Sequence, residues 1–93
     1  MIVGICNIEL SMYENHSLKE KRHLVKSIIE KIKHRYNVSI AEVGMMDKWQ
    51  KAEIGFTTVS NNKRHVDETM QKVLNFIEQD GRFDLAVQQY EIF

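Results

Sequence analysis

Two stretches of the chain repeat apolar residues every three or four positions, the spacing of one face of an α-helix. The first predicted helix covers residues 17–36 and opens with a possible capping box between Ser17 and Glu20. The second begins after Asn61 or Asn62 and ends at Gly81. The apolar stripes comprise Leu18, Leu24, Val25, Ile28, Ile29, Ile32 and Tyr36 in the first helix, and Val66, Met70, Val73, Leu74 and Ile77 in the second.

Four other stretches, residues 1–13, 38–46, 50–60 and 82–93, alternate apolar and polar positions as β-strands do. In the first of them, one face carries Ile2, Gly4, Cys6, Ile8 and Leu10, which we expect to face the core. Its other face begins with apolar Val3 and Ile5 and continues with polar residues. In the last stretch the alternation changes phase near Gln88 and Gln89, which predicts a β-bulge or a twist there.

The predicted order of elements is therefore β-α-β-β-α-β, which favours an α+β, ferredoxin-like sandwich. We expect a mainly antiparallel four-stranded sheet in the strand order 4-1-3-2, with both helices on one face and right-handed crossovers. No helix remains to cover the other sheet face. Because Val3 and Ile5 would lie there, that face is a candidate surface for a partner or for a second copy of the chain.

The 93 residues are enough for one domain, residues 1–93, and their formal net charge is zero. The charge is unevenly distributed: residues 17–36 hold seven Lys and Arg against two Glu, whereas the rest holds six basic and eleven acidic residues. The single cysteine excludes an internal disulfide, and the chain has no membrane-length apolar run and no signal-peptide pattern. These features predict a cytoplasmic protein without contact with a membrane.

The basic residues of the first helix include a column, which we call the basic column, on one helix face. Its members recur at steps of three, four and seven positions and are Lys19, Arg22, Lys26 and Lys33. Such a face can contact the phosphates of RNA, giving affinity rather than sequence readout. The alternative is a solvated helix face that happens to be basic, and Glu30 beside the column would weaken it. No aromatic motif of the RNA-recognition type marks the predicted strands.

Lys21 is a local anomaly, a charged residue whose helix angle falls inside the apolar stripe, between Leu18 and Leu24. The simpler interpretation is a lysine whose stem packs on the core while its ammonium group reaches water. The alternative is a semi-buried ammonium group paired with a sheet carboxylate, Glu42 or Glu53, which could also form an anion site.

The remaining candidates favour binding over catalysis. Trp49 in the predicted hairpin either covers the edge of the core or forms an exposed anchor for a partner. Cys6 alternates inward and is expected to be a small core residue, and the four histidines lack metal-ligand spacing. The chain contains no phosphate-binding loop, dinucleotide fingerprint or nucleophile elbow. We therefore expect no metal, no cofactor and no enzymatic activity.

Three motifs in order along the chain resemble the YlxP-like family of bacterial proteins. They read S-L-K-E-K-R at residues 17–22, Y-N-V-S-I-A-E-V at 36–43 and W-Q-K-A-E-I-G-F at 49–56, followed by V-S-N at 59–61. The resemblance covers the whole chain and implies a ferredoxin-like fold, but no established activity. In many bacteria the family's gene lies among genes for transcription elongation, translation initiation and ribosome maturation, which implies a role near RNA or the ribosome by association only.

Together these observations favour a non-enzymatic protein that binds RNA or the ribosome through the basic column, as a homodimer. Two alternatives stay open. One is a dimeric small-molecule-binding or regulatory domain, and the other is a protein-interaction module that does not bind RNA.

Overall fold

Six elements follow one another in the order that the sequence predicts. The computed structural model describes residues 1–93. The predicted strand ranges exceed the observed ones by no more than two residues at either end. The elements are β1 (Ile2–Ser11), α1 (Leu18–Arg35), β2 (Ser39–Gly44), β3 (Lys51–Ser60), α2 (Lys63–Asp80) and β4 (Asp84–Ile92).

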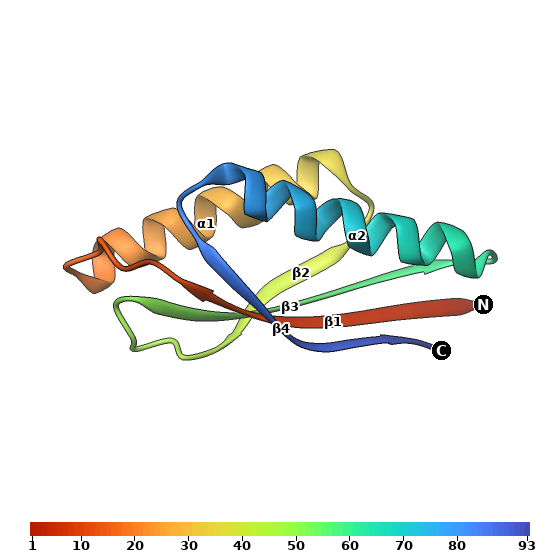
Figure 1. The fold of residues 1–93 in the computed structure, drawn as a ribbon, viewed down its shortest axis with the longest axis horizontal. Coiled ribbons are helices and arrows are strands. Elements are labelled where there is room, and N and C mark those ends of the chain that lie inside the picture. The colour runs from red at the N-terminus through yellow and green to blue at the C-terminus, as the bar shows by residue number, and fades with distance from the viewer.

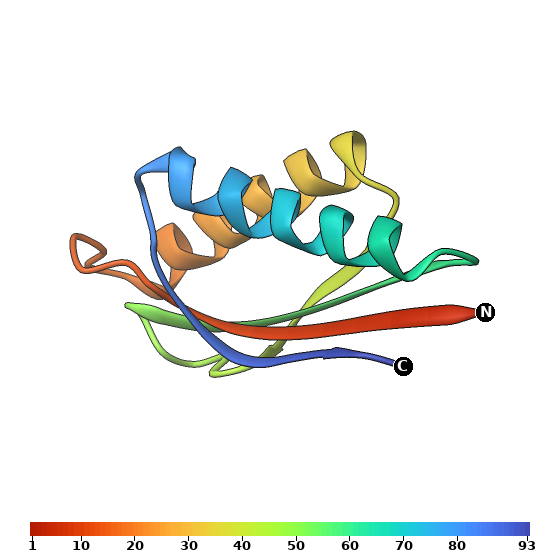
Figure 2. The same ribbon diagram turned by 45° about the vertical axis from the view of Figure 1, so that its right-hand side comes forward.

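The four strands form one antiparallel sheet in the order β2-β3-β1-β4, which confirms the predicted ferredoxin-like arrangement. Both helices lie on the same face of this sheet, and no element covers the other face (Figures 1 and 2). The predicted irregularity in the last strand is also confirmed. Asn7 of β1 pairs with Gln89 and the next residue, Ile8, pairs with Val87, so that Gln88 is an extra residue in β4.

The core lies between the helices and the sheet and contains 17 buried apolar residues. Along β1 the predicted alternation holds, since Cys6, Ile8 and Leu10 are buried. Gly4 follows the same phase and lets α2 approach the sheet closely. A Cβ atom at this position would lie 2.6 Å from Cγ1 of Val66, much closer than carbon atoms pack.

The helix ends are capped by side chains, with one difference from the predicted geometry. Ser17 accepts a hydrogen bond from the Glu20 N–H (3.1 Å), as expected. The Glu20 carboxylate, however, accepts from the N–H of His16 (3.3 Å) and not from that of Ser17, so the predicted reciprocal capping box is wrong in this half. At α2, Asn62 is the N-cap and Gly81 ends the helix with a left-handed φ of 81°.

Candidate nucleic-acid interface

The four residues of the basic column all lie on α1 and are exposed to solvent. Their neighbours on α1 show which way the column faces. The buried residues Lys21 and Val25 face the sheet, while Arg35 lies over the Phe76 ring of α2, 4.8 Å from its centroid. Ser27 also faces the α2 side, since Arg82, just after that helix, reaches its hydroxyl group (3.5 Å).

At 100° per residue, the column lies on the side of α1 opposite to Ser27 and Arg35. The basic column is therefore turned away from α2. Since α1 packs beside β2, the outermost strand on that side of the sheet, the column runs along the β2 edge of the molecule.

No carboxylate forms an ion pair with the column. The ion pairs of the structure join Lys21 with Glu42, Lys51 with Glu9, Arg64 with Glu68 and Arg82 with Asp80. None of them includes a column residue, and Glu30, which we expected to weaken the column, forms no ion pair with it. The four cationic groups are therefore free to contact an external anion, and their long side chains can adjust to it.

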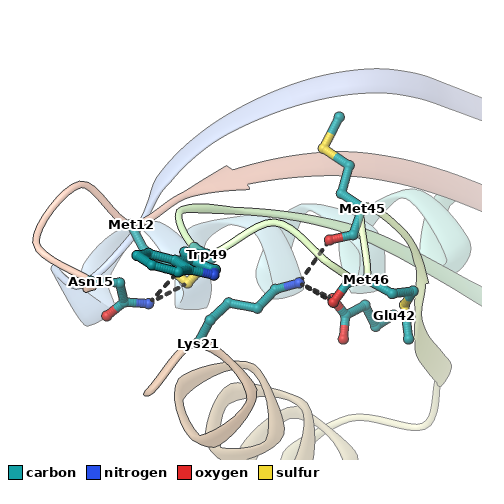
Figure 3. A network of polar contacts seen from close by, with 7 residues as sticks. All are labelled: Met12, Asn15, Lys21, Glu42, Met45, Met46 and Trp49. Carbon is teal, nitrogen blue, oxygen red and sulfur yellow. Dashed lines mark hydrogen bonds and ion pairs between the residues drawn. The ribbon is translucent and has the colours of Figure 1, made fainter. Parts of the chain in front are cut away.

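Lys21 forms an internal clamp between α1 and the loop that joins β2 and β3. Its side chain is fully buried, and its Nζ lies 2.7 Å from Oε2 of Glu42 (Figure 3). The ammonium group also donates to the carbonyl oxygens of Met45 (2.8 Å) and Met46 (3.5 Å). The simpler interpretation of Lys21, with its ammonium group in water, is wrong. The ammonium group is enclosed by these contacts and has no exposed surface, so it is not open to an anionic ligand from solvent.

The register of the sheet explains why Glu42 and not Glu53 is the partner of Lys21. Glu42 pairs with Ile54, a core residue, and so points to the helix-covered face. Glu53 is the next residue on β3 and points to the opposite, uncovered face. There it accepts a hydrogen bond from the Asn7 amide (2.8 Å). The structure thus brings together only one of the two candidate carboxylates with Lys21.

Trp49 lies in the loop between β2 and β3 and is 55% exposed. Its backbone is nevertheless held: Asn15 donates to the Trp49 carbonyl oxygen (3.4 Å) and to the sulfur of Met12 (3.6 Å). The neighbouring Gln50 donates to the carbonyl oxygens of Asn15 (2.9 Å) and Tyr13 (3.1 Å). Sequence analysis missed Asn15 and Gln50, because a polar residue in a short connection carries no periodic signal.

The uncovered sheet face is apolar at one end and acidic elsewhere. Val3 and Ile5, the predicted partner residues, are half-buried there. Register places Val59 (50% exposed) and Phe93 (65% exposed) beside Val3, two contacts that sequence analysis did not identify. Further along this face, the strand pairings place Glu9, Glu53 and Asp84 with only Lys51 to offset them, and Glu91 lies at the apolar end, opposite Ile5. An anionic ligand would therefore meet repulsion over most of this face.

The nucleophilic and metal-ligating side chains do not gather into a second site. Cys6 is 1% exposed, and burial raises the pKa of its thiol to about 11, so that it stays protonated near neutral pH. No three His, Cys, Asp or Glu side chains converge on one point. Burial and a hydrogen bond to Asp67 raise the pKa of Tyr90 to about 12, and this contact ties β4 to α2. Neither helix is both long and apolar enough to cross a membrane.

Comparisons with known proteins agree with the resemblance found in the three sequence motifs. The Bacillus subtilis (strain 168) protein described as "Uncharacterized protein YlxP" is 33% identical over 92 residues, which cover 99% of this chain and 100% of that relative. A family model described as "Protein of unknown function (DUF503)" matches residues 3–90. The resemblance to the YlxP-like family is thereby confirmed. The chain belongs to the DUF503 family of proteins of unknown function.

Proposed function

We propose that this protein is a non-enzymatic binding protein that associates with RNA or the ribosome in the cytoplasm, using the basic column of α1. The observation that carries the proposal is the set of four exposed cationic groups along the β2 edge, none of them in an ion pair with a carboxylate. Cationic side chains aligned on one helix can contact successive phosphates of an RNA backbone.

The distribution of charge supports this orientation of the RNA. The uncovered sheet face is acidic, so the long-range field of the protein would turn α1 toward a polyanion and the sheet away from it. A formal net charge of zero gives no affinity by itself, and binding would therefore depend on this one helix.

The proposal gives a quantitative salt dependence. If all four column residues replace counterions on a single-stranded RNA, the logarithm of the binding constant falls with the logarithm of salt concentration with a slope of about 2.8. Raising the salt concentration from about 50 to about 200 mM would then weaken binding roughly 50-fold.

The experiment measures binding of the purified protein to ribosomal subunits and to total RNA at these two salt concentrations. The double variant Lys26→Glu/Lys33→Glu changes the charge of the column by four units. Its matched control is Lys63→Glu/Lys72→Glu, which makes the same charge change at two exposed positions of α2. The proposal requires salt-sensitive binding that the α1 variant loses and the α2 variant retains. Equal losses in both variants, or no binding by wild type, contradict it.

The same proposal includes a homodimer formed at the apolar end of the uncovered sheet face. Val59 and Phe93 expose about half or more of their surface there, beside Val3 and Ile5. The acidic residues of this face would repel one another if two sheets stacked in full, so the contact is expected to be offset toward the apolar end. Sedimentation velocity over a range of concentrations tests this. A Val59→Glu variant should be monomeric where wild type is dimeric, and a monomeric wild type contradicts the dimer.

A small-molecule-binding role is the second candidate, because a shallow depression of about 570 Å³ lies on the uncovered face over β1, β2 and β3. Asn7 is one of its lining residues. The amide nitrogen of Asn7 donates to Glu53, and its buried Oδ1 has no hydrogen-bond partner, so a ligand donor that shifts this side chain enough to expose the oxygen would gain a hydrogen bond. Thermal-shift screening with metabolites tests this role, and a stabilising compound should lose its effect in an Asn7→Leu variant.

A further inference from the structure

Trp49 combines an exposed indole ring with a tightly held backbone. The loop that carries it is fixed at its start by the bonds from Lys21 to the carbonyl oxygens of Met45 and Met46. It is fixed at its end by the amide groups of Asn15 and Gln50. Figure 3 shows the contacts of Lys21 and of Asn15 with this loop. Since ordering a surface loop costs conformational entropy, a loop held in advance can present its aromatic ring without further cost on binding.

The ring lies beside two lysines that are near it in the chain, at the end of the molecule where α1 begins. A shallow hollow of about 390 Å³ lies against Trp49, with Lys48 and Lys51 on either side of it in the chain. Lys48 forms no ion pair, and Lys51 is half-exposed in a 3.4 Å ion pair with Glu9. The loop and the first turn of α1 lie at the same end of the molecule in Figures 1 and 2, and Lys19 belongs to that first turn.

We propose that Trp49 is a stacking platform for a base of single-stranded RNA whose phosphates contact the basic column. The inference rests on the proposed function and adds the kind of RNA to it. Duplex RNA keeps its bases paired and stacked inside the helix, so an exposed ring can stack only on an unpaired base. Binding grooves for single strands combine cationic side chains with aromatic rings, and each stack is sequence-tolerant because every base has a π-face.

The lysines that flank the ring, Lys48 and Lys51, favour RNA as the partner. Met45 and Met46 of the same loop are also exposed, so an apolar protein surface is the competing occupant that the test must exclude. Trp49 lies in the loop that Lys21 clamps at Met45 and Met46, and Lys21 stands on the same helix as the column. A strand of RNA that follows the column toward its first residue, Lys19, therefore reaches the end of the molecule where Trp49 lies.

The test uses intrinsic fluorescence, because Trp49 is the only tryptophan of the chain. An unlabelled oligoribonucleotide of about twelve unpaired nucleotides is titrated into the wild-type protein, and an abasic oligonucleotide of equal length serves as the control. Stacking should quench the emission with the intact strand and leave it nearly unchanged with the abasic strand. In parallel, anisotropy of a labelled strand should show binding at least about 5-fold weaker for Trp49→Ala. Trp49→Phe should recover part of that loss, since its ring can still stack.

The salt dependence separates this inference from the proposed function. Trp49→Ala should bind more weakly with an unchanged salt slope, because stacking releases no counterions, whereas Lys26→Glu/Lys33→Glu should lower the slope. The stacking platform is overturned if RNA binding is salt-sensitive, the tryptophan emission is not quenched, and Trp49→Ala binds RNA as tightly as wild type. The proposed phosphate contacts would remain supported by that result. A further outcome also overturns the stacking platform: wild type retains a protein partner from ribonuclease-treated extract, Trp49→Ala does not, and both bind RNA equally well. No RNA binding by wild type at low salt overturns both proposals.

Discussion

Replacing Lys21 by Met removes the buried ammonium group and keeps most of the volume of its stem. In the folded protein the ammonium group meets Glu42 and the carbonyl oxygens of Met45 and Met46. The substitution leaves the Glu42 carboxylate without its partner at a position where its side chain is only 14% exposed. It also removes the hydrogen bonds that the carbonyl oxygens of Met45 and Met46 accept from Lys21.

The size of the effect follows from the burial of the pair. Removing one partner of a buried ion pair destabilises a protein by about 3–5 kcal/mol, because the remaining charge is left uncompensated. Partial hydration of Glu42 would reduce this cost, and the loss of the two carbonyl contacts would add to it. We therefore expect Lys21→Met to lower the free energy of unfolding by about 3–5 kcal/mol, out of the roughly 5–15 kcal/mol typical of a domain.

Urea denaturation followed by far-UV circular dichroism measures this change. For an m-value of about 1–1.5 kcal/mol/M, the midpoint should fall by roughly 2–5 M. The matched control is Lys31→Met, an exposed position on the same helix, which should change stability by less than about 0.5 kcal/mol. If Lys21→Met unfolds the protein outright, Glu42→Gln provides a milder variant, since its amide oxygen still accepts a hydrogen bond from Lys21.

A double variant separates the ion pair from general damage to the core. Lys21→Met/Glu42→Met removes both charges, so it should be more stable than Lys21→Met, although the loop carbonyl groups stay unpartnered. The reasoning about the clamp is refuted if Lys21→Met costs less than about 1 kcal/mol. It is also refuted if the two substitutions are additive, since additivity would mean that the two groups do not interact.

Three further predictions concern packing, pH and reactivity. Gly4→Ala should lower stability by about 1–3 kcal/mol in the same urea assay, because the new Cβ atom would overlap the side chain of Val66. The hydrogen-bonded Arg82 guanidinium holds the pKa of Asp80 below its ordinary value, so the pair contributes stability above the unfolded pKa of Asp80 and loses it as pH falls through the folded pKa. Arg82→Gln should therefore cost about 0.5–1 kcal/mol at pH 7, and the difference from wild type should vanish in acid. Cys6 should react with a thiol reagent at pH 8 only in denaturant, because its thiol is buried with a pKa of about 11.

The fold could be predicted from the sequence because local patterns and the global arrangement agree. The alternation along β1 identifies its buried face, and the change of phase near Gln88 anticipates the bulge that the pairing with β1 confirms. Each of these signals lies within a single element. They suffice because a sheet with two amphipathic helices has few ways to bury all its apolar faces.

The arrangement around the loop between β2 and β3 could not be predicted in the same way. Helix angle marked Lys21 as anomalous, but its choice of Glu42 over Glu53 depends on the β-bulge and the register of β2 against β3. Met45 adopts a left-handed conformation (φ 57°), although it is neither glycine nor asparagine, the residues that usually indicate this conformation in a sequence. The carbonyl oxygen of Met45 accepts from Lys21, which offsets part of the cost of that conformation. Tertiary contact thus fixes a loop that its own residues do not specify.

This dependence gives Lys21 a role in the proposed binding without any contact with RNA. Lys21→Met leaves the charge of the column and the ring of Trp49 in place and releases only the start of the loop. If the held loop is what makes Trp49 effective, a folded Lys21→Met protein should bind single-stranded RNA with the wild-type salt slope and with reduced affinity and quenching. Higher mobility of the indole, measured by fluorescence anisotropy of the free protein, should accompany the loss. Wild-type affinity in a variant whose indole has become mobile would show that the rigidity of the loop serves the fold alone.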